Sequence, residues 1–233
     1  MNRKVENILI AVLVVLAFGG AVAPGQAPID PNLPEAPLPE NGAIFTPGYD
    51  VVRPDETPVP PLTDKQKVEI AIHKTFSPSI LLKSAIFTGF DRGLGTGPDY
   101  GEGWESAGKL CGYTTANIAS TYMIGGGVIP VLFHQDPRYF RKGSGPVKSR
   151  ILYALRSEVI AYSDRGTLMP NYGTIIGFGM SSALSNAYLP PSDEVSFRNT
   201  MSRYALKFAV SSGFRVWAEF GGYRCLIDRL RHR

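Results

Sequence analysis

LCGYTTANIASTYMIGGGVIPVLF, residues 110–133, contains no charged side chain, and neither does GTLMPNYGTIIGFGMSSALSNAYLPPS, residues 166–192. Small residues recur at every fourth position in both regions: Gly108, Gly112, Ala116 and Ser120 in the first, and Gly173, Gly177, Ser181 and Ser185 in the second. Residues four apart share one face of a helix, and small residues there let two helix backbones approach closely. We therefore predict two helices that touch along these small residues.

The sequence around these stretches predicts further helices. Thr63-Asp64-Lys65-Gln66 is a capping box that opens a helix. A glycine-rich loop is expected over residues 89–103, an amphipathic helix over residues 147–162, and a last helix from after Ser192 to beyond Trp217. No run of alternating apolar and polar residues predicts a strand. The expected fold class is therefore mainly α, a compact helical bundle over residues 63–233 with small-residue (Gly/Ala/Ser) helix packing.

The chain begins with the pattern of a secretory signal. Basic residues precede an apolar run from Ile8 to Ala23, which predicts export to the periplasm or cell envelope. The small-x-small site that ends at Ala23 is followed by Pro24, which disfavours cleavage at that point. Residues 1–23 are therefore either a signal peptide cleaved after Ala21 or an uncleaved N-terminal membrane anchor.

Residues 24–62 contain eleven prolines and few large hydrophobic residues. Such a composition buries too little apolar surface to offset chain entropy, and its prolines favour extended backbone. We predict a Pro-rich disordered linker that acts as a spacer. A motif for a proline-reading partner is the alternative.

Charge is distributed unevenly along the chain. The formal net charge is +4, of which residues 1–23 contribute +1, residues 24–62 contribute −5 and residues 63–233 the remaining +8. For an exported chain, a basic body predicts a membrane surface or an anionic envelope polymer as partner, and it argues against nucleic acid. The expected anion-binding residues are Arg138, Arg141, Lys142, Lys148 and Arg150. Cys111 and Cys225 are either a disulfide pair or two small buried hydrophobic residues.

The two uncharged stretches leave the location of the body open. Each is long enough to span a bilayer as a helix, and aromatic residues flank both. Their many hydroxyl and amide side chains, and Pro130 and Pro170, weaken that reading. Both a partly embedded body and a compact exported domain are therefore consistent with the sequence.

Candidate catalytic residues are few. His134, Asp136 and Arg138 lie two positions apart, with Glu158 as a conceivable third acidic or metal-binding group, although a turn is the simpler reading. Three further patterns fail on spacing or context: residues 103–110 miss the P-loop by one residue, Gly179–Ala183 lacks a strand for a nucleophile elbow, and the acids near the glycine loop lack EF-hand spacing. We therefore predict no metal and no cofactor.

The sequence resembles a family of exported, mainly acidobacterial proteins of unknown activity. The resemblance rests on HQDPRYF at residues 134–140, GSG at 143–145, SRILYA at 149–154 and PNY at 170–172. The resemblance implies that the same body recurs behind a signal sequence, and it implies no particular activity. We therefore predict a non-enzymatic, membrane- or wall-associated envelope protein. The alternatives are a hydrolase or metal-dependent enzyme centred on His134, and a homo-oligomer that forms a pore or scaffold.

Overall fold

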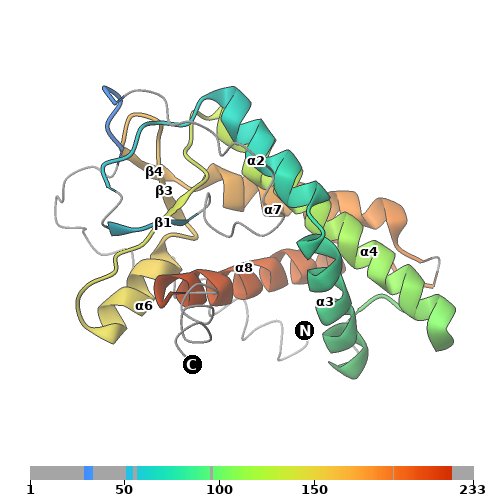
Figure 1. Ribbon diagram of the computed structural model, residues 1–233. Helices are drawn as coiled ribbons and strands as arrows, with labels where there is room; N and C mark the ends of the chain where they lie inside the picture. The colour runs from blue at the N-terminus through green and yellow to red at the C-terminus, as the bar shows by residue number, and fades with distance from the viewer. Residues whose placement is uncertain (1–28, 34–50, 55–56, 95–96, 191, 222–233) are drawn as a thin grey trace.

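The computed structural model describes residues 29–33, 51–54, 57–94, 97–190 and 192–221. This part of the chain is mainly helical, which confirms the mainly α part of the predicted fold class. Figure 1 shows two short sheets and α6 at one end of the molecule and α3 and α4 at the other. The helices are α2 (Asp64–Phe76), α3 (Ser79–Leu94), α4 (Gly103–Met123), the π-helix η2 (Ile124–Val128), α5 (Ile129–Leu132), α6 (Val147–Arg156), α7 (Tyr172–Leu184), the 3-10 helix η3 (Ser185–Tyr188) and α8 (Phe197–Glu219).

The ends of several helices follow from local sequence. Thr63 Oγ1 accepts the Gln66 N–H at 3.3 Å and Gln66 Oε1 accepts the Thr63 N–H at 2.9 Å, so the predicted capping box of α2 is present. The helix ends at Phe76 because Ser77, which precedes a proline, is extended. Helix α8 begins after Ser196, whose Oγ accepts the Asn199 N–H, and continues past Trp217 as predicted.

Helix α3 is longer than the sequence indicated. It continues to Leu94, so the predicted loop over residues 89–103 is wrong for its first six residues. Glycine costs only about 1 kcal/mol in a helix and does not stop it. Arg92 supports the last turn, because its guanidinium donates to the carbonyl of Gly101 and to Ser106 Oγ.

Helices α4, η2 and α5 form one continuous rod. Within η2 the Ile129 N–H bonds the Ile124 carbonyl, five residues back, which is a π-type turn. Gly125, Gly126 and Gly127 offer no side chains to oppose this wider turn, and Pro130 has no N–H to donate. The π-turn presents Gly125 to α7.

The two uncharged stretches touch, but only one of the two predicted rows of small residues lies at the contact. A Cβ at Gly177 would lie 2.4 Å from Gly125 Cα, and one at Gly173 would lie 2.6 Å from the Gly125 carbonyl oxygen. A Cβ at Gly108 or Gly112 would have no heavy atom within 4 Å. The predicted contact through Gly108, Gly112, Ala116 and Ser120 is therefore wrong. The first three are exposed and Ser120 is intermediate, and it is Gly125 that lies against α7.

Four short strands were not predicted. β3 (Ile160–Tyr162) pairs antiparallel with β4 (Leu168–Pro170), with Ile160 opposite Pro170. The helix expected over residues 147–162 therefore ends at Arg156, and the second uncharged stretch becomes helical only at Tyr172. The Asn171 side chain supports both of these helix ends. Its Oδ1 accepts the Thr174 N–H at the start of α7, and its Nδ2 donates to the Ser157 carbonyl at the end of α6.

The described part of the proline-rich segment packs on the body. β1 (Val51–Val52) pairs in parallel with β2 (Tyr139–Phe140). Ile29, Val52 and Phe140 form a buried cluster, and Ile29 bridges to Val59. The described residues of the segment 24–62 therefore pack on the body and do not form an extended spacer.

Several predictions fall beyond the described ranges. They concern residues 1–23, most of the linker, and Cys225, so the proposed pairing with Cys111 is not placed. In the described ranges, no helix combines the length and the apolarity that a membrane crossing requires.

Candidate functional site

Helix α7 buries mainly small and hydroxyl residues. Its buried residues are Gly173, Thr174, Gly177, Ser181 and Ser182. Its large apolar residues are less buried: Ile175, Ile176 and Phe178 are intermediate, and Met180 and Leu184 are about half exposed. An amphipathic helix in water normally buries its large apolar side chains, so α7 departs from that pattern.

Helix α3 repeats this arrangement. Ser84 and Thr88 are buried together with Ile80, whereas Leu81, Leu82 and Ile86 are exposed. Two of the buried hydroxyls are satisfied within their own helices: Ser84 Oγ donates to the Ile80 carbonyl at 2.8 Å, and Thr114 Oγ1 of α4 donates to the Leu110 carbonyl at 2.9 Å. These two groups therefore need no water as a partner.

Exposed apolar side chains continue from α3 onto α8. The rings of Phe87 and Phe214 are 6.2 Å apart, as are those of Phe214 and Trp217. We define the apolar surface by its exposed members on four helices: Phe76, Leu81, Leu82, Ile86, Met180, Leu184, Phe197, Leu206, Phe214 and Trp217. Contiguous exposed apolar side chains are the usual mark of an interaction surface, and the ring contacts of Phe87, Phe214 and Trp217 join the α3 and α8 parts of this one.

Most of the predicted anion-binding residues have partners inside the protein. Arg138 pairs with Asp136, at 2.5 Å between Nη2 and Oδ2, and donates to the Pro60 carbonyl at 2.8 Å. Lys142 Nζ is 2.6 Å from Ser149 Oγ. Arg141 and Arg150 both bond Glu219. Of the five residues, only Lys148 falls in the exposed class.

His134, Asp136 and Arg138 do not form one site. Asp136 is buried and is occupied by Arg138, whereas the His134 side chain is 79% exposed and faces Asp164, with 4.0 Å between Nδ1 and Oδ2. His134 lies in the left-handed region with φ 50°, as expected for a turn residue. Glu158, the proposed third group, pairs with Arg215 of α8 at 2.6 Å. Burial raises the pKa of Glu158, and Arg215 offsets only part of that increase.

One cluster has the composition of a metal site. Ligand atoms of Asp64, His134 and Asp164 lie within 4.8 Å of one another. The buried Lys67 ammonium already lies between the carboxylates, 2.7 Å from Asp164 Oδ2 and 3.4 Å from Asp64 Oδ1, and it also reaches the Pro130 carbonyl. Lys67 would repel a cation there. The cluster is therefore explained by the ion pair of Lys67 with Asp164, which joins α2 to the turn between β3 and β4.

Lys207 of α8 lies between two hydroxyls. Its Nζ is 2.6 Å from Ser181 Oγ and 3.0 Å from Thr121 Oγ1. Burial first, and then the charge of Arg203, lower the pKa of Lys207 to about 7. A serine beside such an amine has the geometry of a nucleophile and its base. Ser181 is fully buried, however, and the three groups join α4, α7 and α8.

Replacing Lys207 with methionine is expected to remove a pH dependence of stability. The lysine titrates near 10.4 when unfolded and at about 7 when folded. Between these values the unfolded state binds a proton that the folded state does not, so the free energy of unfolding rises with pH, by up to about 1.4 kcal/mol per unit. Urea unfolding of both proteins at about pH 7.5 and 9.5 measures this difference. Lys148→Met, at an exposed lysine, is the control, and equal slopes for wild type and Lys207→Met would contradict the prediction.

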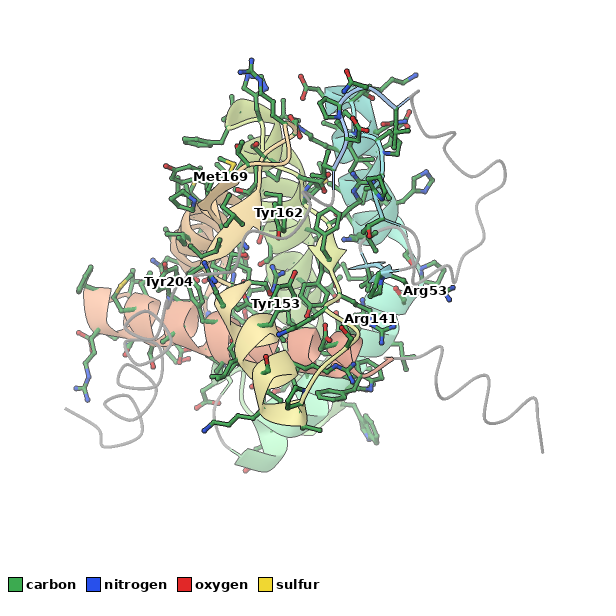
Figure 2. All side chains as sticks on the ribbon, turned by 90° about the vertical axis from the view of Figure 1, so that its left-hand side faces the viewer. Arg53, Arg141, Tyr153, Tyr162, Met169 and Tyr204 are labelled. Carbon is green, nitrogen blue, oxygen red and sulfur yellow. The ribbon has the colours of Figure 1, made fainter. Side chains whose placement is uncertain are left out.

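The Glu219 carboxylate accepts hydrogen bonds from four different residues. It is fully buried at the end of α8 and accepts from Tyr139 Oη, Arg150 Nε, Lys142 N and Gly143 N, all at 2.8–3.0 Å. Figure 2 shows Arg141 beside the same end of the helix, where it donates to the Glu219 carbonyl at 2.9 Å. Burial raises the pKa of Glu219, but Arg150 and the other donors together hold it below its usual value.

Sequence reasoning missed Glu219, although one signal was available. It is the only acidic residue of α8 and stands at the C-terminal end, where the helix dipole disfavours a carboxylate. Such a residue needs cationic partners, and the basic residues between 138 and 150 supply them. Among the predicted anion-binding residues, Arg150 pairs with the Glu219 carboxylate and Arg141 bonds the Glu219 carbonyl.

Two weak patterns are also placed. Residues 103–110 form the first turns of α4, where Glu105 pairs with Lys109 at 2.7 Å, so they do not form a phosphate-binding loop. Asp99 accepts a hydrogen bond from the Gly101 N–H within its own turn.

Comparison with protein-family models, curated proteins and solved structures finds no match. The resemblance to the exported acidobacterial family therefore stays a prediction.

Proposed function

We propose that this chain is an exported, non-enzymatic protein of the cell envelope whose folded body associates with a membrane through the apolar surface. Export rests on the signal-like sequence of residues 1–23. The association rests on α3 and α7, which bury mainly small and hydroxyl side chains and expose Leu81, Leu82, Ile86, Met180 and Leu184.

This arrangement suits contact with lipid. Helices in lipid pack through glycine, alanine, serine and threonine, and direct their large apolar side chains to the acyl chains. The close contact between Gly125 and Gly177, and the interhelical hydrogen bond of Thr121 to Ser181 at 3.2 Å, are of this kind. In water, the exposed leucine and phenylalanine side chains would each retain an unfavourable hydration free energy.

Apolar contact, and not charge, is expected to dominate the association. The sequence predicted a cationic surface, but four of its five residues bond groups within the protein. Binding that depends on exposed cations weakens steeply with salt, whereas apolar burial does not. The proposed association should therefore survive high salt.

The candidate catalytic groups support a non-enzymatic role. Asp136, Ser181 and Glu158 are buried and bonded to protein partners, and His134 faces an ion pair. The reading as a hydrolase centred on His134 has no geometric support among these contacts.

An envelope-fractionation experiment tests the proposal. The chain is expressed with a fully cleavable signal in place of residues 1–23, and envelopes are washed first with high salt and then with alkaline carbonate. The body is expected to stay with the membrane through the salt wash. Release by low-salt buffer alone would show that any attachment belongs to residues 1–23, and would refute the proposal.

A further inference from the structure

Helix α3 has an outer face that carries no charge from Leu81 to Gly89. Leu81, Leu82 and Ile86 are 60%, 57% and 50% exposed, and Ala85 and Gly89 lie on the same exposed side. On its other side α3 packs against α4, where Thr88 Oγ1 approaches Thr114 Oγ1 at 3.5 Å. Figure 1 shows α3 at the edge of the molecule beside α4. The helix therefore offers one full side to its surroundings.

The two cationic residues of α3 bond groups of the body: Lys83 lies on the side that faces α4, and Arg92 is exposed in the last turn, beyond this face. Lys83 Nζ donates to Tyr122 Oη at 3.0 Å and lies 5.4 Å from the centre of the Tyr122 ring, on α4. Arg92 reaches the Gly101 carbonyl and Ser106 in the next turn. Both side chains are thus bound to the body, and the apolar outer face is left without a cation to hydrate it.

A lipid phase fits this face better than a second copy of the chain does. A two-fold interface uses one self-complementary patch on each subunit. Here large apolar side chains are exposed on α3, α7 and α8. A bilayer covers apolar groups without specific complementarity, and the apolar run of residues 8–23 would bring the body to it.

We propose that α3 is the element of the body that enters the membrane, lying in the interface plane with Leu81, Leu82 and Ile86 among the acyl chains. This proposal rests on the proposed function and names the part of the apolar surface that makes the contact. Interfacial helices bury their apolar face roughly 5–10 Å into the boundary between headgroups and acyl chains. The remaining side of α3 stays on α4, as it is in the structure.

A lipid-quenching experiment on the full-length chain tests this. Cys111 and Cys225 are replaced with alanine, and single cysteines are introduced by Leu82→Cys, by Met180→Cys on α7 and by Leu152→Cys on α6. Leu152 is 51% exposed and so matches Leu82 in exposure. Each protein is labelled with bimane and reconstituted into vesicles of phosphatidylethanolamine and phosphatidylglycerol, with or without a lipid that carries a doxyl group at a shallow acyl position. Circular dichroism melts verify that each variant is folded.

The emission maximum of the bimane at position 82 is expected to move to shorter wavelength, and the doxyl lipid is expected to quench about half of its emission. The bimane at position 152 is expected to show neither change. Quenching at 180 and not at 82 would overturn the role of α3 and leave membrane association standing. Quenching at neither position would overturn both proposals. A shifted but unquenched label at 82 would mean that protein covers α3, and equal quenching at 152 would mean that α3 has no special role; either result overturns the inference.

Discussion

Replacing Glu219 with alanine is expected to lower the free energy of unfolding by about 3–5 kcal/mol. The carboxylate is fully buried and holds Arg150, Tyr139 and two backbone N–H groups. Removing it leaves these donors, and a largely buried guanidinium, without their acceptor. Urea unfolding followed by circular dichroism measures the loss.

Glu194→Ala is the matched control, because Glu194 is an exposed carboxylate close to the other end of α8. It is expected to change the free energy of unfolding by less than about 0.5 kcal/mol.

The pH dependence of the free energy of unfolding supplies a second test of the role of Glu219. A carboxyl group whose pKa is lowered on folding contributes stability above its unfolded pKa and loses it as the pH falls through the folded value. Wild type should therefore lose more stability in acid than Glu219→Ala, and parallel acid profiles would disprove the assigned role.

Replacing Gly177 with alanine is expected to destabilise the body by about 3 kcal/mol. The new Cβ would lie 2.4 Å from Gly125 Cα and 3.0 Å from Gly125 N. These are backbone atoms of η2, so no side-chain rotation can relieve the overlap and α7 must move away. The same denaturant titration measures the effect.

Gly112→Ala is the matched substitution at the other row of small residues. Gly112 lies inside α4 with nothing within 4 Å of its Cβ direction, so alanine is expected to stabilise the helix by about 1 kcal/mol. The same substitution in each of the two uncharged stretches should therefore have opposite effects on stability. Destabilisation by both would show that the Gly108–Ser120 row is also packed, as in the oligomer hypothesis.

Local sequence determined where several helices begin and end. The Thr63–Gln66 capping box and the proline after Ser77 act through backbone groups within a few residues, so they set the bounds of α2 without help from the rest of the fold. The contact between the two uncharged stretches was also predictable, since only small residues allow such close backbones.

Only the tertiary structure decided which face of each helix is inside. Spacing shows that Gly108, Gly112 and Ala116 share a face, but it does not say whether another helix covers that face, and within the described ranges all three are exposed. In the same way a count of basic residues shows charge but not its partners, and Arg150 pairs with Glu219, 69 residues away. Burial and ion pairing depend on residues far apart in the chain, and these meet only when the helices pack.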